Sequence, residues 1–119
     1  MNILVIDDDK EFLYLFKNLV HKNDMHVQTA INGMLALEIL NTNKIDLVIT
    51  DAIMPDTPIM SFICTIKNSY PKTPLILMSG LPTNPLINNS MILGADEFIP
   101  KPINLGQLLS TIDRFKKAA

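Results

Sequence analysis

Four short apolar segments each end at polar residues that could take part in metal or phosphate chemistry. The first, residues 3–6, is followed by three consecutive carboxylates, Asp7, Asp8 and Asp9. The later segments end at Asp51, Ser79 and Lys101. Clustered carboxylates repel one another unless a cation lies among them, and their oxygens suit a hard divalent ion such as Mg²⁺. An amine and a hydroxyl beside that ion would suit a phosphoryl group.

These side chains meet only if the chain forms an open parallel sheet, because the carboxyl ends of parallel strands share one edge. Strand-like runs occur at residues 2–6, 25–29, 46–50, 74–78 and 96–99. Between them, apolar residues recur at helical spacing over Phe12/Leu15/Phe16/Leu19, residues 33–41, Ile59/Phe62/Ile63/Ile66 and Leu105/Leu108/Leu109/Ile112. Three runs are apolar throughout, which is typical of strands covered on both faces. The pattern predicts an α/β fold with five β-α repeats and a doubly wound parallel sheet.

The segment from Leu81 to Ser90 is the least regular part of the chain. Asn84 followed by Pro85 indicates that the fourth helix starts late, since these residues suit an N-cap and a first helical position. Poor helix formers follow, so we expect this helix to be the loosest of the five.

Composition limits the class of protein. Residues 1–119 are expected to form a single domain, with 48% hydrophobic and 18% charged residues. A net charge of −2 gives no basic surface, so we expect no direct nucleic-acid contact by this chain. The apolar runs are too short to span a membrane, and Asp7 interrupts the first one too early for a signal peptide. The single cysteine favours a cytoplasmic protein.

Each polar position also has a purely structural interpretation. Asp8 and Glu11 have the spacing of a helix capping box, which would explain one or two of the three aspartates. Asp51 and Ser79 could belong to turns, and Lys101 could be a solvated lysine. Four such coincidences at one sheet edge are much less probable than one shared site. In that site Asp51 would be a carboxylate nucleophile for phosphoryl transfer.

The order and spacing of these motifs resemble the receiver domain of two-component response regulators, of the chemotaxis-regulator type, over essentially the whole chain. The matching motifs are Ile3–Asp9, Thr50-Asp51 with Met54-Pro55, Met78-Ser79-Gly80, Gly94-Ala95-Asp96 and Lys101-Pro102. The resemblance implies a flavodoxin-like (βα)5 sandwich, with strand order 2-1-3-4-5 and helices on both faces.

The resemblance also implies roles for the site residues. Asp51 would be the phosphoacceptor. The ligands of Mg²⁺ would be Asp7, Asp8, Asp51 and the backbone carbonyl of Ile53. Ser79 and Lys101 would bind the phosphoryl group, and Ser79 and Phe98 would act as the switch residues, although Phe98 could equally be an ordinary core residue.

The implied function is a signalling phosphoacceptor, not an enzyme. The phosphoryl donor would be a sensor histidine kinase or a histidine phosphotransfer domain. A downstream protein target would bind the face formed by the fourth helix, last strand and fifth helix. The printed sequence ends at residue 119 without an output domain, and we therefore expect either a stand-alone receiver or a piece of a longer regulator.

Two other functions compete with this one. A Mg²⁺-dependent phosphohydrolase of the haloacid-dehalogenase type usually has a second aspartate two residues after its nucleophile, where this chain has Ile53. The leaving group would then lack its proton donor. A degenerate receiver that binds partners without phosphorylation remains the alternative, because Ile53 and Leu81, which flank the site, are both apolar.

Overall fold

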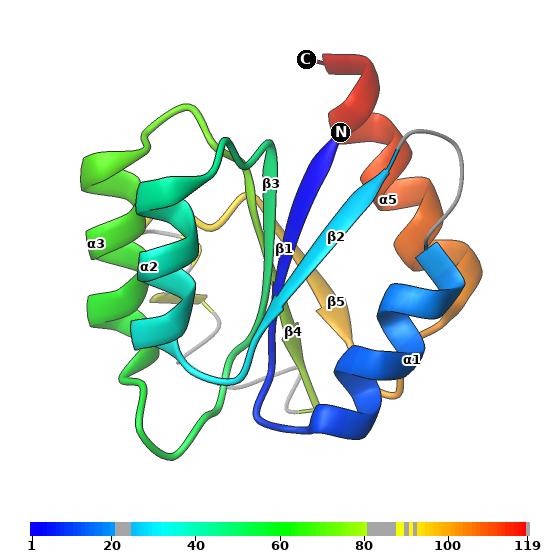
Figure 1. Cartoon of the computed structure of the whole chain (residues 1–119), viewed down its shortest axis with the longest axis horizontal. Coiled ribbons are helices and arrows are strands. Elements are labelled where there is room, and N and C mark those ends of the chain that lie inside the picture. The colour runs from blue at the N-terminus through cyan, green and yellow to red at the C-terminus, as the bar shows by residue number, and fades with distance from the viewer. Residues whose placement is uncertain (21–24, 81–87, 90, 92, 119) are drawn as a thin grey trace.

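Five parallel strands form one sheet in the order β2-β1-β3-β4-β5 (Figure 1). The strands are β1 (Asn2–Ile6), β2 (His26–Ala30), β3 (Leu47–Asp51), β4 (Leu75–Ser79) and β5 (Glu97–Pro100). The computed structural model describes residues 1–20, 25–80, 88, 89, 91 and 93–118. The predicted fold class and strand order are confirmed.

Four of the strands begin or end one residue later than the sequence predicted. The predicted strands 46–50 and 74–78 end just before Asp51 and Ser79. Strand pairing is made by backbone groups, however, and Asp51 pairs with Met78 while Ser79 pairs with Pro100. Two site residues are therefore held within the sheet itself and not in the loops that follow it.

Helices cover both faces of the sheet (Figure 1). One face carries α2 (Gly33–Thr42) and α3 (Ile59–Ser69), and the other carries α1 (Lys10–Val20) and α5 (Leu105–Ala118). These are the four helices whose bounds are given within the described residues. The predicted late start of the fourth helix falls on residues 81–87, which lie outside them. No helix in the described part of the chain has both the length and the apolar character needed to cross a bilayer.

The strands supply one hydrophobic core to each layer of helices. Along β1, Leu4 and Ile6 pack in the core beneath α2 and α3, whereas Ile3 and Val5 pack in the core beneath α1 and α5. All four are fully buried. Successive side chains of a strand point to opposite faces, so a strand with a core on each side is apolar throughout.

The apolar residues that recur at helical spacing in α1 and α5 are only partly buried. In α1 the buried residues are Leu13, Phe16 and Val20, whereas Leu15 and Leu19 are exposed. Apolar residues occupy more than one side of this helix, so periodicity alone cannot decide which side meets the sheet. In α5 Leu108 and Ile112 are buried, but Leu105 and Leu109 are exposed. In α3, all four apolar residues noted for their helical spacing are buried.

Candidate functional site

The register of the sheet brings the predicted site residues to one edge. Ile6 of β1 pairs with Thr50 of β3, so the residues that follow them, Asp7 and Asp51, are neighbours. Ser79 pairs with Pro100, and the backbone N–H of Lys101 donates to the Ser79 carbonyl oxygen at 2.8 Å. Four strands thus bring polar residues to the same end of the sheet. Asp7 follows β1, Asp51 ends β3, Ser79 ends β4 and Lys101 follows β5.

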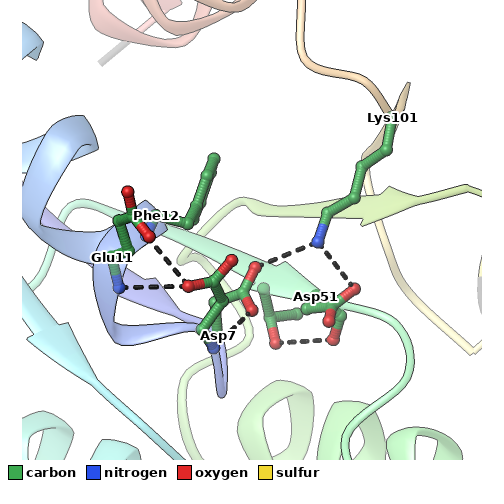
Figure 2. Close-up of polar contacts among 7 residues, drawn as sticks. Asp7, Glu11, Phe12, Asp51 and Lys101 are labelled. Carbon is green, nitrogen blue, oxygen red and sulfur yellow. Dashed lines mark hydrogen bonds and ion pairs between the residues drawn. The ribbon is translucent and has the colours of Figure 1, made fainter.

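Lys101 extends its amine between two buried carboxylates (Figure 2). The Nζ atom lies 3.1 Å from Asp7 Oδ2 and 3.5 Å from Asp51 Oδ1. Asp7 is 1% exposed and Asp51 is 8% exposed. The other oxygen of Asp7 accepts a hydrogen bond from the backbone N–H of Asp9 at 3.0 Å. The side chain of Lys101 therefore lies at the acidic site, as the sequence predicted.

Carboxylate oxygens of Asp7, Asp8 and Asp51 lie within 4.8 Å of one another. Two of these residues are buried and Asp8 is exposed, so the cluster opens toward solvent. Three oxygen donors with a shared open side suit Mg²⁺, which binds carboxylate oxygens and keeps several water ligands. The donor set present in the chain therefore fits this ion.

The third consecutive aspartate has a different role from the first two. Asp9 precedes α1, and its Oδ1 atom accepts hydrogen bonds from the backbone N–H groups of Glu11, at 3.0 Å, and Phe12, at 3.2 Å. It is therefore the residue that caps the helix. The capping interpretation of Asp8 is wrong, because the helix begins at Lys10 and its N-cap position falls on Asp9.

The remaining predicted residues lie near the same edge. Ser79 is buried at the end of β4. Ile53 lies two residues after the end of β3, its backbone N–H donates to Asp51, and the residue is 52% exposed. Phe98 lies on β5 opposite Leu77 and is half-buried against the core beneath α2 and α3. The placement of these three residues is compatible with the roles that the resemblance implied, and the roles themselves stay predictions.

Sequence reasoning missed one neighbour of the site. The ring centroid of Phe12 lies 5.5 Å from Lys101 Nζ. In the sequence Phe12 was only one member of an apolar helical pattern. A signal was available, since a residue in the first turn after the aspartates must lie at the same sheet edge as Lys101.

The charges of the site are strongly coupled. Burial raises the pKa of Asp51 above its ordinary value and the charge of Asp7 raises it further, while Lys101 and the backbone N–H of Ile53 oppose the shift without cancelling it. Burial lowers the pKa of Lys101, but its hydrogen bond to Asp7 and the charges of Asp51 and Asp7 outweigh that effect and raise it overall. The Lys101 amine is consequently charged at neutral pH. The ionised form of Asp51 is less stable in the folded protein than in water.

We expect Asp51→Asn to be more stable than wild type at pH 7 in metal-free buffer, by about 0.5–2 kcal/mol, the usual range for a stabilising single substitution. A carboxyl group whose pKa is raised by folding stabilises the fold below its unfolded-state pKa and loses that contribution as pH rises through the folded-state value. The advantage of the variant should therefore shrink as pH falls through the raised folded-state pKa of Asp51, and it should vanish below about pH 3, where the carboxyl is protonated in both states because the pKa of an unfolded aspartate is about 3.9.

Urea unfolding in EDTA at several pH values measures this difference. Asp96→Asn is a control of opposite sign, because Asp96 accepts hydrogen bonds from Lys67 and from the backbone N–H of Leu75, each at 2.8 Å. That variant should be less stable than wild type at pH 7. An Asp51→Asn protein that is also less stable at pH 7 would contradict the account of the site's electrostatics.

The comparison with known families agrees with this geometry. Residues 3–113 match the family model described as the response regulator receiver domain. The chain belongs to this family. Receiver domains are signalling phosphoacceptors and not enzymes, and they generally bind Mg²⁺ at an acidic pocket. They interact with histidine kinases or phosphotransfer proteins.

Known proteins similar to this receiver domain include two bacterial regulators. The nisin biosynthesis regulatory protein NisR of Lactococcus lactis subsp. lactis is 32% identical over 93% of this chain and 48% of its own length. The DNA-binding transcriptional regulator NtrC of Proteus hauseri is 27% identical over 95% of this chain and 24% of its own length. The chain thus spans about half or less of these relatives. The name of the Proteus protein weakens the expectation of no nucleic-acid partner for any longer protein that contains this chain.

A solved structure shows the same fold over nearly the whole chain. The two-component response regulator from Clostridium difficile superposes with a TM-score of 0.92 at 25% identity, covering 98% of this chain and 96% of that protein. The receiver fold is therefore common to both proteins over their full matched length.

Proposed function

We propose that Asp51 accepts a phosphoryl group, with Mg²⁺, from a phosphohistidine of a histidine kinase or phosphotransfer domain, and that this modification switches partner binding. The observation that carries the proposal is the position of the Lys101 amine, which lies beside Asp51 at the edge of a three-carboxylate cluster. A single ammonium next to a potential nucleophile and a set of metal ligands is the arrangement that phosphoryl transfer requires.

The carboxylates of Asp7, Asp8 and Asp51, together with the backbone carbonyl of Ile53, would hold the metal ion. When bound, Mg²⁺ neutralises charge on the phosphoryl oxygens and on the three carboxylates. Asp8 is the exposed member of the cluster. The role of Asp9 as the helix cap supports Asp7 and Asp8 as the proposed ligands from this segment.

In the transfer step an Asp51 carboxylate oxygen forms a bond to phosphorus as the P–N bond of the donor phosphohistidine breaks. The electron pair of that bond leaves with the imidazole nitrogen. Lys101 keeps its charge at neutral pH and reaches both Asp7 and Asp51, so it can pair with the incoming phosphoryl oxygens by a small movement of its flexible side chain. The product is an acyl phosphate on Asp51.

Ser79 and Phe98 would convert the added charge into a change of shape. Ser79 ends the strand next to Asp51 and would donate a hydrogen bond to the phosphoryl group, while Phe98 lies on the neighbouring edge strand. The downstream target would bind the face of the fourth helix, β5 and α5, of which the fourth helix lies largely outside the described residues. Beryllofluoride with Mg²⁺, a stable mimic of the phosphoryl group, should shift the ring-proton NMR signals of Phe98. Identical signals in both states would contradict the switch role.

Incubation with acetyl phosphate and Mg²⁺, followed by intact-mass measurement, tests the proposed function. The wild type should gain one phosphoryl group and Asp51→Asn should gain none. A folded wild-type protein that gains no phosphoryl group would refute the proposal and favour the degenerate receiver, which binds partners without phosphorylation.

Ile53 should lengthen the life of the acyl phosphate, because an exposed apolar side chain beside Asp51 cannot orient an attacking water molecule. Ile53→Asn is expected to lose phosphate about two- to tenfold faster, a smaller gain than the full effect of a general base. Phosphate release after removal of acetyl phosphate measures the rate. Leu109→Asn is the matched control, because Leu109 is an exposed apolar residue on α5 and should leave the lifetime unchanged. An unchanged lifetime in Ile53→Asn would count against this role.

A further inference from the structure

The amine of Lys101 faces an aromatic ring as well as two carboxylates. Its nitrogen lies 5.5 Å from the centroid of Phe12, within the range of about 6 Å over which a ring attracts a cation. Figure 2 shows Phe12 on the first turn of α1, beside the acidic site. We propose that Phe12 is a positioning residue, whose ring holds the Lys101 ammonium over Asp7 and Asp51 and so raises the rate of phosphoryl transfer. This inference rests on the proposed function.

Two contacts restrict Phe12, one at its backbone and one at its ring. The backbone N–H of Phe12 donates to the capping carboxylate of Asp9 at 3.2 Å. The ring packs against that of Phe16, with centroids 5.9 Å apart and planes inclined at 47°. Phe16 is 4% exposed, so this contact ties Phe12 to the core beneath α1 and α5. The ring is therefore a fixed surface against which a mobile side chain can rest.

Lys101 needs such a surface because its charge is on the end of a long, flexible stem. Its side chain is 31% exposed, and the ammonium has three donors that solvent could also satisfy. The carboxylates of Asp7 and Asp51 attract the amine from one side. On the other side lies an apolar groove of about 390 Å³ between α1 and α5, lined by Phe12, Leu15, Leu19, Pro102, Ile103 and Leu105 among others. Phe12 lines this groove and is also the residue whose ring faces the amine.

An aromatic ring does more here than an aliphatic side chain of similar size. The negative face of the ring attracts the ammonium, whereas leucine offers only apolar contact. The loss of that attraction would leave Lys101 free to turn toward solvent for part of the time. We therefore expect replacement of the ring to slow phosphorylation of Asp51 modestly, and we expect the effect to depend on aromaticity and not on burial at position 12.

Two variants and a control separate positioning from structural support. Phe12→Leu should be phosphorylated by acetyl phosphate, at saturating Mg²⁺, about two- to fivefold more slowly than wild type, the effect of one exposed cation–π contact. Phe12→Tyr keeps a ring and should restore the wild-type rate. Phe115→Leu removes a half-buried phenylalanine that packs against the same core from α5 and lines a different cavity, and its rate should match wild type.

A spectroscopic measurement tests the placement without phosphorylation. In wild type, the NMR signals of the Lys101 ε-methylene protons should be shifted upfield by the ring, and the shift should disappear in Phe12→Leu and persist in Phe12→Tyr. Phosphorylation of Phe12→Leu at the wild-type rate, equal slowing in Phe115→Leu, or Lys101 signals at the position of a solvated lysine would each overturn the inference. The proposed function fails separately, if wild type itself is not phosphorylated.

Discussion

Lys101→Met is expected to be phosphorylated by acetyl phosphate about 100- to 1,000-fold more slowly than wild type, the usual cost of losing one group that stabilises transition-state charge. Methionine keeps the length and apolar character of the stem but removes the ammonium. In the fold that ammonium lies 3.5 Å from an Asp51 oxygen and 3.1 Å from an Asp7 oxygen. No other cation in the described residues forms an ion pair with either carboxylate. The rate should therefore fall steeply even at saturating Mg²⁺.

The same substitution removes the cation beside the buried Asp7, and we expect it to reduce the free energy of unfolding by about 1–3 kcal/mol. Lys67→Met controls for this loss. Lys67 donates to Asp96 at 2.8 Å and to the Thr73 carbonyl oxygen at 2.7 Å. Thr73 and Asp96 precede β4 and β5, so they lie at the opposite end of the strands from Asp51 and Lys101. That variant should also be less stable yet be phosphorylated at a rate within about twofold of wild type, as expected for a change outside the site. Equal slowing in both variants would mean that Lys101 acts only through stability.

The second large effect concerns the metal. Wild type should be stabilised by Mg²⁺ in thermal unfolding, by about 2.7 kcal/mol when the ion is present at 100 times its dissociation constant. Asp8→Ala should lose most of this stabilisation, because it removes the exposed carboxylate of the cluster. Its phosphorylation at a fixed, low Mg²⁺ concentration should fall at least about 100-fold, since a bound metal ion supplies several kcal/mol of transition-state charge stabilisation.

Asp9→Ala is the matched control for Asp8→Ala in the Mg²⁺ measurements, because it makes the same substitution at the adjacent aspartate. Asp9 caps α1, so its loss should reduce stability by about 0.5–2 kcal/mol while the response to Mg²⁺ is retained. If Asp9→Ala loses the response and Asp8→Ala keeps it, the assignment of the two carboxylates is reversed. A wild type that shows no response to Mg²⁺ would contradict the metal site itself.

Much of the architecture could be predicted from the sequence because the strongest signals are local. Continuous apolar runs such as Leu47–Ile49 require helices on both faces of the sheet, and the polar residues at their ends require a shared edge. Spatial convergence of Asp51 and Lys101, 50 residues apart in the chain, then follows from parallel topology. The family resemblance added the strand order, which periodicity alone does not give.

The remainder depends on three-dimensional packing that a single sequence does not specify. Asp8 and Asp9 are chemically identical, and only the position at which α1 begins decides which one caps the helix. Leu15 and Leu19 repeat at the same spacing as the buried residues of α1, so their exposure depends on how the helix is rotated against the sheet. The approach of Phe12 to Lys101 depends on both of these details.

Whether Asp51 itself carries the phosphoryl group is tested most directly by reduction of the phosphorylated protein with borohydride, followed by peptide mass mapping. Hydride converts an aspartyl acyl phosphate into homoserine, which marks the modified position permanently. We expect homoserine at position 51 alone, dependent on Mg²⁺ and absent from a sample that was not phosphorylated. A phosphoryl group that maps to Ser79, to a histidine or to another aspartate, with position 51 unmodified, would contradict the assignment of the site.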